Sequence, residues 1–385
     1  MAYLNNAATT WPKPECVVNA VRDFMLKGGA NSSRGSNSAR DMNTMNIILD
    51  CRMKAAKFFG GWEDSNPLLV TFTANITEAL NVVLRGYLRP GMSVITSSME
   101  HNAVMRPLRA LEACGVNVSV VSADSEGSLD PSEFRRVLSG GKYDLAVMSH
   151  ASNVCGTIQP VETIAEICRA HNVPLVLDTA QTAGIIPLSA SELGLAALCF
   201  TGHKSLMGPQ GTGGIIWNPD FPSKVVPIIT GGTGSYSHLE TQPDDMPDKF
   251  ESGTPNLPGI AGLNVAFDWL NDTGVNEIAR RENDTGEYFL EGLREIGGVI
   301  LHGKRTMSGR LPVFALNATG RDNGILADEL SRMGFETRPG LHCAPSAHKT
   351  LGTFPQGALR VSPGYFTGRD EIDGFFEALK EVLRV

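Results

Sequence analysis

Short apolar runs alternate with amphipathic stretches through the middle of the chain. The runs have the length and composition of buried strands, and they lie at 68–72, 93–96, 117–121, 145–148, 175–177, 197–200 and 214–217. Stretches with helical spacing lie between them, at 78–88, 103–113, 131–138 and 161–171. This alternation predicts an α/β fold with a mostly parallel sheet, and such sheets bind ligands beyond the carboxyl ends of their strands.

The pattern changes after residue 257. A long helical stretch at 260–296, interrupted near 271–274, leads into a smaller α/β segment. Its expected strands lie at 299–302, 310–316 and 335–338, and its expected helices at 323–333 and 369–383. A chain of 385 residues exceeds the size that one core usually serves. We expect a large domain over 15–258, and a small domain formed by 1–14 and 259–385 that includes the connecting helix.

Composition narrows the class of protein. Lys and Arg total 33 against 41 for Asp and Glu, a net charge of −8 that disfavours a nucleic-acid partner. No apolar run approaches the roughly 20 residues of a membrane span, and the N-terminal residues do not read as a secretion signal, so we expect a cytoplasmic protein. The seven cysteines form no CxxC pair, which predicts neither a disulfide framework nor a metal site.

A lysine and a carboxylate follow two consecutive apolar runs. Lys204 comes after the run at 197–200, in a turn rich in small residues and glycines, and Asp178 ends the run before it. A lysine that forms a Schiff base must be aimed and partly desolvated. Pyridoxal phosphate (PLP) requires such an amine for its aldehyde and an anion for its pyridinium nitrogen.

Other polar residues stand at strand-to-helix junctions and in loops. Around Asn75 and Thr77, free N–H groups at a helix start could bind phosphate, although a plain helix cap explains them too. His101 could stack on a planar ring or could simply be a hydrogen-bonded structural histidine. Asn153 and Gln181 could donate to a phenolic oxygen, and ordinary turn chemistry is the alternative for Asn153.

The C-terminal part supplies a cysteine and an arginine. Cys343 lies beside His342 in a turn-rich loop, which suits an accessible nucleophile but also fits a chance free cysteine. Arg360 lies in an otherwise apolar strand, and a buried arginine needs an anion such as a substrate carboxylate.

Together these segments resemble the class V aminotransferase family of PLP enzymes, and within it the cysteine desulfurases. Residues 3–10 resemble the family's N-terminal "YLDNAATT", and 338–344 resemble the "RxGxHCA" loop of the type II desulfurases. Further segments look like family signatures in the expected order: 152–156, 178–181, 201–204 and 250–256. The resemblance implies the aspartate-aminotransferase-like fold, fold type I.

The resemblance also implies roles for single residues. Lys204 would hold PLP, Asp178 would pair with the pyridinium nitrogen, and His101 would stack on the ring. The other residues implied in cofactor binding are Asn75, Ile76, Thr77, Asn153, Gln181, Thr201 and His203. Thr254 would reach the phosphate of the neighbouring subunit in a homodimer with shared sites. Arg360 would clamp the substrate carboxylate, with Asn153, Ala8 and Arg338 also contacting substrate.

The implied reaction converts L-cysteine to L-alanine and leaves a persulfide on Cys343 for an acceptor protein. Lys204 would move the α-proton, and His101 or His342 could handle the thiol proton. A selenocysteine lyase acting on L-selenocysteine, and another class V activity, are the alternatives. A silent subunit or scaffold is disfavoured because the lysine, the carboxylate and the cysteine are all present.

Two segments depart from the type II pattern. Residues 33–38 carry an asparagine and serines where those enzymes commonly place a histidine, and 345–352 differ from their usual continuation. Both departures are consistent with a divergent branch of the family.

Overall fold

The protein is built on a seven-stranded, mostly parallel sheet. A computed structural model describes residues 1–28, 30–31 and 38–383. The strand order is β2-β8-β7-β6-β5-β3-β4, and β8 runs opposite to the other six strands. The strands are β2 (Val70–Thr73), β3 (Ser93–Ser97), β4 (Asn117–Val121), β5 (Leu145–Ser149), β6 (Leu175–Asp178), β7 (Ala197–Thr201) and β8 (Gly213–Trp217). The predicted α/β fold and each predicted strand of this sheet are confirmed.

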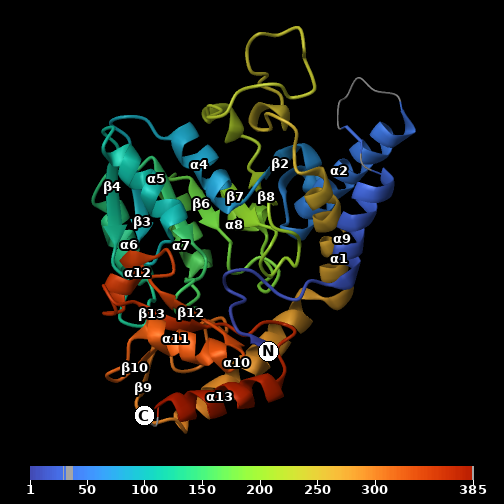
Figure 1. Ribbon diagram of the computed structural model, residues 1–385. Helices are drawn as coiled ribbons and strands as arrows, with labels where there is room; N and C mark the ends of the chain where they lie inside the picture. The colour runs from blue at the N-terminus through green and yellow to red at the C-terminus, as the bar shows by residue number, and fades with distance from the viewer. Residues whose placement is uncertain (29, 32–37, 384–385) are drawn as a thin grey trace.

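Alternating side chains of these strands build two apolar layers, one on each face of the sheet. In β6, Val176 joins one layer, whereas Leu175 and Leu177 join the other. Two helices cover the Val176 face, namely α4 (Ile76–Tyr87) and α5 (Asn102–Glu112). The opposite face packs against α2 (Ala39–Phe58), α6 (Pro131–Ser139), α7 (Val161–Ala170) and α9 (Leu257–Thr273) (Figure 1).

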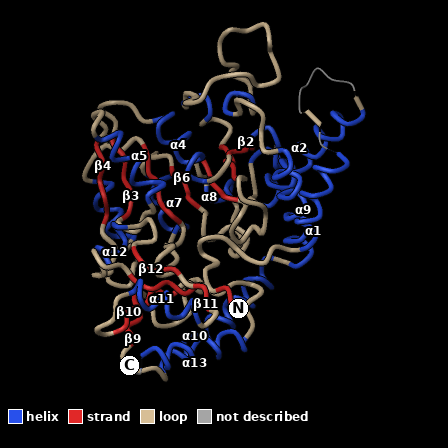
Figure 2. The backbone as a smooth tube through the Cα atoms, in the orientation of Figure 1, coloured by secondary structure: helices blue, strands red, loops and turns tan. Residues whose placement is uncertain are grey.

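A smaller antiparallel sheet lies below this layer structure (Figure 2). Its order is β12-β13-β10-β9, and its strands are β9 (Val299–His302), β10 (Phe314–Ala318), β12 (Arg338–Gly340) and β13 (Ala358–Val361). Its apolar core includes the stacked rings of Phe289, Phe314 and Phe375. The helices of this part are α10 (Val275–Arg294), α11 (Asn323–Arg332), α12 (Pro345–Thr350) and α13 (Arg369–Leu383).

The N-terminus joins the smaller part. β1 (Ala2–Tyr3) pairs with β11 (Phe335–Glu336), and Leu4 is buried in the core of the smaller sheet. The connecting helix α9 packs on α2 and on α1 (Glu15–Asp23) and contributes to the core of the large sheet. The predicted domain limits, 15–258 for the large domain and 1–14 with 259–385 for the small one, stay a prediction.

Several elements were not predicted from the sequence. They include α1, α2, α12 and the split of the strand predicted at 335–338 into β11 and β12. The remaining short elements are a π-helix at Phe24–Gly28, α3 (Trp62–Ser65), α8 (Ala190–Leu193), and 3-10 turns at Pro67–Leu69, Pro222–Lys224 and Asp248–Phe250. None of the helices within the described ranges is both long and apolar enough to cross a membrane.

Candidate active site

The carboxyl ends of neighbouring strands bring the predicted lysine and carboxylate to one edge of the large sheet. β6 ends at Asp178, and Lys204 follows the end of the adjacent strand β7 by three residues. Lys204 is half-buried, and burial lowers its pKa to about 8, while the Asp178 carboxylate acts in the opposite direction. An amine with this pKa can hold or release a proton near neutral pH.

Asp178 is a buried carboxylate with few protein partners. Its Oδ1 accepts a hydrogen bond from the Ala180 backbone N–H at 2.8 Å, and its Oδ2 lies 3.4 Å from Ser149 Oγ. Burial raises the pKa of Asp178, and among the described cations only Lys204 opposes that shift. A buried anion with so little compensation is suited to a cationic ligand.

A second buried carboxylate, Glu100, was not singled out from the sequence. It accepts hydrogen bonds from the N–H and the hydroxyl of Ser149, both at 2.8 Å, and from the Ser97 hydroxyl. Burial raises the pKa of Glu100 to about 7, and the nearby Asp178 adds to the rise. The single hydroxyl hydrogen of Ser149 favours the closer Glu100, which leaves Asp178 Oδ2 available for another donor.

His101 has an observed structural role at this edge. It precedes α5, and its Nδ1 accepts a hydrogen bond from the Ala103 backbone N–H at 3.0 Å, so in the neutral ring Nε2 carries the hydrogen. Burial lowers the pKa of His101 to about 4, and the charges of Lys204, Arg338 and Arg360 add to this effect. His101 therefore caps helix α5, and the stacking of its ring on a cofactor stays a prediction.

Cys343 lies on a turn that is held from two sides. The thiol is exposed, and both Cys343 (φ 57°) and His342 (φ 49°) adopt left-handed backbone conformations that non-glycine residues seldom use. The Asn102 backbone N–H donates to the Cys343 carbonyl, and Asn153 Nδ2 donates to the His342 carbonyl, each at 2.7 Å. Arg338 Nη2 lies 3.8 Å from the sulfur of Cys343 and places a positive charge beside it.

Arg360 is a buried cation directly opposite another arginine. Only 1% of it is exposed, and it donates to the Asn153 carbonyl and to Asn5 Oδ1, both at 2.9 Å. Its Nε has no partner in the described part of the chain. Arg338 faces Arg360 across β12 and β13, a placement of like charges that destabilises a sheet. Burial and the charge of Arg338 lower the pKa of Arg360 to about 9. An anion at this position could accept a hydrogen bond from Arg360 Nε and would compensate the facing charges of Arg338 and Arg360.

The residues predicted to line a phosphate meet where β7, β8 and α4 come together. Asn75 caps α4 by accepting a hydrogen bond from the Glu78 N–H at 3.0 Å, and Thr77 is exposed, whereas Ile76 is buried. The Asn75 backbone packs so closely on Gly213 that a Cβ there would lie 3.0 Å away, and Gly213 pairs with Thr201. His203 comes two residues after Thr201, and its buried Nδ1 has no partner among the residues described.

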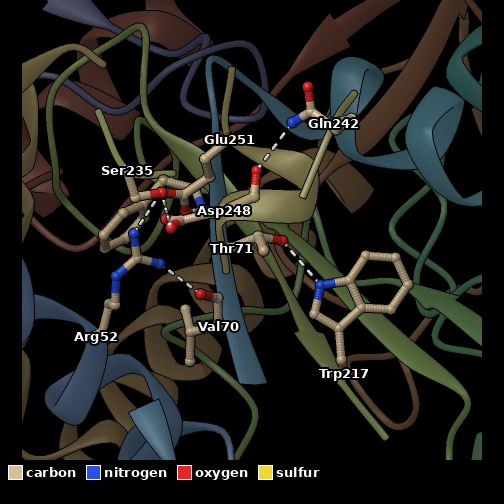
Figure 3. A network of polar contacts seen from close by, with 9 residues as sticks. Arg52, Val70, Thr71, Trp217, Ser235, Gln242, Asp248 and Glu251 are labelled. Atoms are coloured by element: carbon tan, nitrogen blue, oxygen red, sulfur yellow. Dashed lines mark hydrogen bonds and ion pairs between the residues drawn. The ribbon is translucent and has the colours of Figure 1, made fainter. Parts of the chain in front are cut away.

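Thr254 lies in a pocket at the end of β2. The pocket has a volume of about 170 Å³ and is lined by Thr254 together with Thr73, Ala74 and Gly211. Its outer wall is fixed by polar contacts, since Glu251 accepts from the Phe72 N–H and pairs with Arg52. Figure 3 shows this network, in which Arg52 also donates to the Val70 carbonyl, Gln242 donates to the Asp248 carbonyl, Ser235 donates to the Asp248 carboxylate, and Trp217 donates to Thr71.

The N-terminal segment closes the site from the other side. Gln181 Nε2 donates to the Ala7 carbonyl at 3.1 Å, and the neighbouring Ala8 is half-buried. Because a side-chain amide has two N–H groups, Gln181 and Asn153 each keep one for a ligand.

Two further predictions concern the segment that departs from the type II pattern and the binding of a metal ion. Residues 33–37, most of the segment that departs from the type II pattern, lie outside the described residues. No group of three or more histidine, cysteine, aspartate or glutamate side chains suited to a metal ion occurs within 1–28, 30–31 and 38–383.

Comparison with known proteins places the chain in a family. The architecture, a mostly parallel sheet with a second α/β part, is that of fold type I PLP enzymes. The model of the aminotransferase class-V family matches residues 2–375, and the chain belongs to that family.

Relatives and a solved structure cover nearly the whole chain. A probable cysteine desulfurase of Methanothermobacter thermautotrophicus is 31% identical over 386 residues, 99% of this chain and 94% of that protein. A cysteine desulfurase of Pectobacterium atrosepticum is 30% identical over 100% of this chain and 94% of that protein. The apo structure of a cysteine desulfurase from Thermococcus onnurineus NA1 superposes with a TM-score of 0.91 at 28% identity, covering 100% of this chain and 94% of that one.

Proposed function

We propose that this protein is a PLP-dependent cysteine desulfurase. It would convert L-cysteine to L-alanine and collect the sulfur as a persulfide on Cys343. The observation that carries the proposal is the exposed Cys343 thiol on a held turn, with Arg338 beside it and Arg360 opposite that arginine. The names of the relatives support the same activity.

The residues at the sheet edge fit PLP. Lys204 is a partly buried amine with a lowered pKa, and Asp178 is a buried carboxylate with an available oxygen. His203 Nδ1 lacks a partner in the described part of the chain. The start of α4, where Asn75 packs on Gly213 opposite Thr201, offers N–H donors to a phosphate. We propose that the cofactor is held by Asn75, Ile76, Thr77, His101, Asn153, Asp178, Gln181, Thr201, His203 and Lys204, and by Thr254 from a neighbouring subunit. When bound, PLP withdraws electrons from the substrate's α-carbon.

The chain's own groups would then act in order. Arg360, together with Arg338, holds the substrate carboxylate, because an anion there compensates two facing cations. Asn153 and Ala8 complete the substrate contacts. Lys204 takes the α-proton, since a pKa of about 8 allows both proton uptake and release near neutral pH.

The sulfur-transfer step is balanced without an outside oxidant. The Cys343 sulfur attacks the substrate sulfur, an S–S bond forms and the Cβ–S bond breaks. The electron pair of the broken bond goes to Cβ, which takes up a proton, so that carbon is reduced while sulfur is oxidised. The outer sulfur of the persulfide then passes to an acceptor protein, and the Cys343 thiol is released.

A comparison of alanine release from L-cysteine and L-selenocysteine tests this function. We expect wild type to act on cysteine and Cys343→Ala to lose at least about 100-fold of that rate, because the nucleophile is gone. Cys114→Ala, which removes another exposed thiol, is the matched control and keeps the rate. Full activity of Cys343→Ala on cysteine would disprove the persulfide route. Turnover of selenocysteine alone would identify a selenocysteine lyase instead.

We also infer that the enzyme works as a homodimer in the cytoplasm. Apolar side chains are exposed on and near α2 and on the segment after β8; they are Met42, Leu49, Met53, Leu68, Ile228 and Ile229. Ile229 lines the pocket that contains Thr254, and Met42, Leu49 and Leu68 line a second pocket that shares Phe72 and Glu251 with it. The seven cysteines are all free thiols, which suits a reducing compartment.

A further inference from the structure

A chain of buried hydrogen bonds runs behind Cys343. His342 Nε2 lies 2.9 Å from the Arg338 carbonyl, and His342 Nδ1 lies 3.1 Å from His348 Nε2. His348 Nδ1 in turn lies 2.7 Å from Thr353 Oγ1. Both rings are almost fully buried, and His348 belongs to α12, in the segment 345–352 that departs from the type II sequence pattern.

The direction of every hydrogen in this chain follows from its first member. A carbonyl can only accept, so the hydrogen between His342 and Arg338 must sit on His342 Nε2. Burial lowers the pKa of His342 to about 3 and that of His348 to about 4, so both rings are neutral. His342 Nδ1 therefore accepts and His348 Nε2 must donate to it. His348 Nδ1 is left to accept from the Thr353 hydroxyl at 2.7 Å, since the other acceptor near that hydroxyl, the His348 carbonyl, lies farther away at 3.3 Å.

The direction of these hydrogen bonds excludes His342 as the acceptor of the thiol proton and gives it a structural role instead. Both ring nitrogens of His342 are engaged, so it cannot take the thiol proton without breaking the chain. Its ring instead ties Arg338, the first residue of β12, to α12. The turn between them, with Cys343 in a left-handed conformation, spans these two anchors.

We propose that His348 is a positioning residue for sulfur transfer. Its Nε2–H donates to His342 Nδ1 and fixes the orientation of that ring, and so holds Cys343 and Arg338 in their relative places. This inference rests on the proposed function, because that function assigns the Cys343 thiol to sulfur transfer.

Kinetics of three holoenzyme variants test the proposal. His348→Leu removes the donor but keeps an apolar side chain of similar size, whereas His348→Gln retains an N–H that can reach His342 Nδ1. Lys349→Ala alters the next, exposed residue of α12 and is the control. We expect His348→Leu to lower kcat for alanine release about 10- to 100-fold with KM changed less than about threefold, as a misplaced nucleophile does. His348→Gln should recover most of the rate, and Lys349→Ala should match wild type.

Two readouts do not depend on cysteine turnover. In histidine-labelled protein, 15N NMR should show the hydrogen of His342 on Nε2, and His348→Leu should shift the Nδ1 resonance of His342, because that nitrogen loses its donor. The rate at which iodoacetamide alkylates Cys343 should change in His348→Leu and return toward the wild-type value in His348→Gln. If wild type releases no alanine, the proposed function fails, while these two readouts still decide the role of His348.

Contrary outcomes are equally clear. Wild-type kcat and alkylation in His348→Leu would overturn the proposal, as would equal impairment of the Gln and Leu variants. If His348→Leu does not fold, Thr353→Val serves instead, because it removes the hydroxyl that donates to His348 Nδ1 and helps to orient its ring. That variant should lower kcat, though less than His348→Leu does, and a wild-type kcat would contradict the proposal.

Discussion

At the scale of single residues, the site contains charges that the folded chain alone does not compensate. Arg338 and Arg360 face each other across two strands, and Asp178 is buried with one strong hydrogen bond. Each of these arrangements costs stability in the free protein. Such local conflicts are expected where a ligand supplies the missing charge.

Substitution of the buried arginine tests this interpretation. We expect Arg360→Gln to lower kcat/KM for cysteine about 30-fold or more, mainly through KM, because a charged hydrogen-bonded pair contributes about 2–5 kcal/mol. Arg332→Gln, which changes an exposed arginine of α11, should leave the kinetics unchanged. A KM within about twofold of wild type would show that Arg360 does not hold the substrate.

Local sequence context identifies some site residues and conceals others. Lys204 and Asp178 stand at the ends of apolar runs, so their setting could be predicted from the sequence. Glu100 could not, because its link to Asp178 passes through Ser149 on a strand that only the folded sheet brings alongside. His348 was missed as a partner of His342 because α12, which carries it, was not predicted.

At the scale of elements, the sheet was predictable and the peripheral helices were not. Strands buried on both faces read as continuous apolar runs, and each one was located. In contrast, α2 exposes Met42, Leu49 and Met53 on the side away from the core, so its apolar residues do not form one clear stripe.

Helix α10 carries a buried carboxyl group whose titration opposes folding. Burial raises the pKa of Glu282 to about 8, above its ordinary value of 4.5, although the Tyr365 backbone N–H offsets part of this. Ionisation therefore favours the unfolded chain, and the free energy of unfolding falls as the pH rises from about 4.5 to about 8. We expect Glu282→Gln to be more stable than wild type at pH 8, on the order of 2 kcal/mol, and equal at pH 4.

Urea unfolding at a series of pH values measures this difference. Glu287→Gln, an exposed glutamate of the same helix, is the control and should show no such trend. The prediction fails if the stabilisation by Glu282→Gln does not grow between pH 5 and pH 8.

At the scale of the whole molecule, one face carries apolar side chains without a covering layer. They lie on α2 and beside the loop that projects after β8 at the top of Figure 1, around a pocket that shares Phe72 and Glu251 with the pocket that holds Thr254. A second copy of the chain would bury them and complete the site with its own Thr254. Exposed apolar patches of this kind mark association surfaces.

Sedimentation of a charge variant tests the dimer. Leu49→Glu should convert a dimer to a monomer and weaken PLP retention, because a buried, unpaired carboxylate destabilises the interface. Ile325→Glu places the same charge on an exposed position of α11 and should leave the dimer intact. A wild-type protein that is monomeric at micromolar concentration would refute this assembly.

The central claim is that Cys343 receives the sulfur of cysteine. The most direct test incubates the holoenzyme with one equivalent of L-cysteine, without reductant, and examines its peptides by mass spectrometry. The account predicts that the peptide containing Cys343 gains the mass of one sulfur atom as alanine appears. Alanine formation with that peptide unmodified, or with the added sulfur on another cysteine, would contradict it.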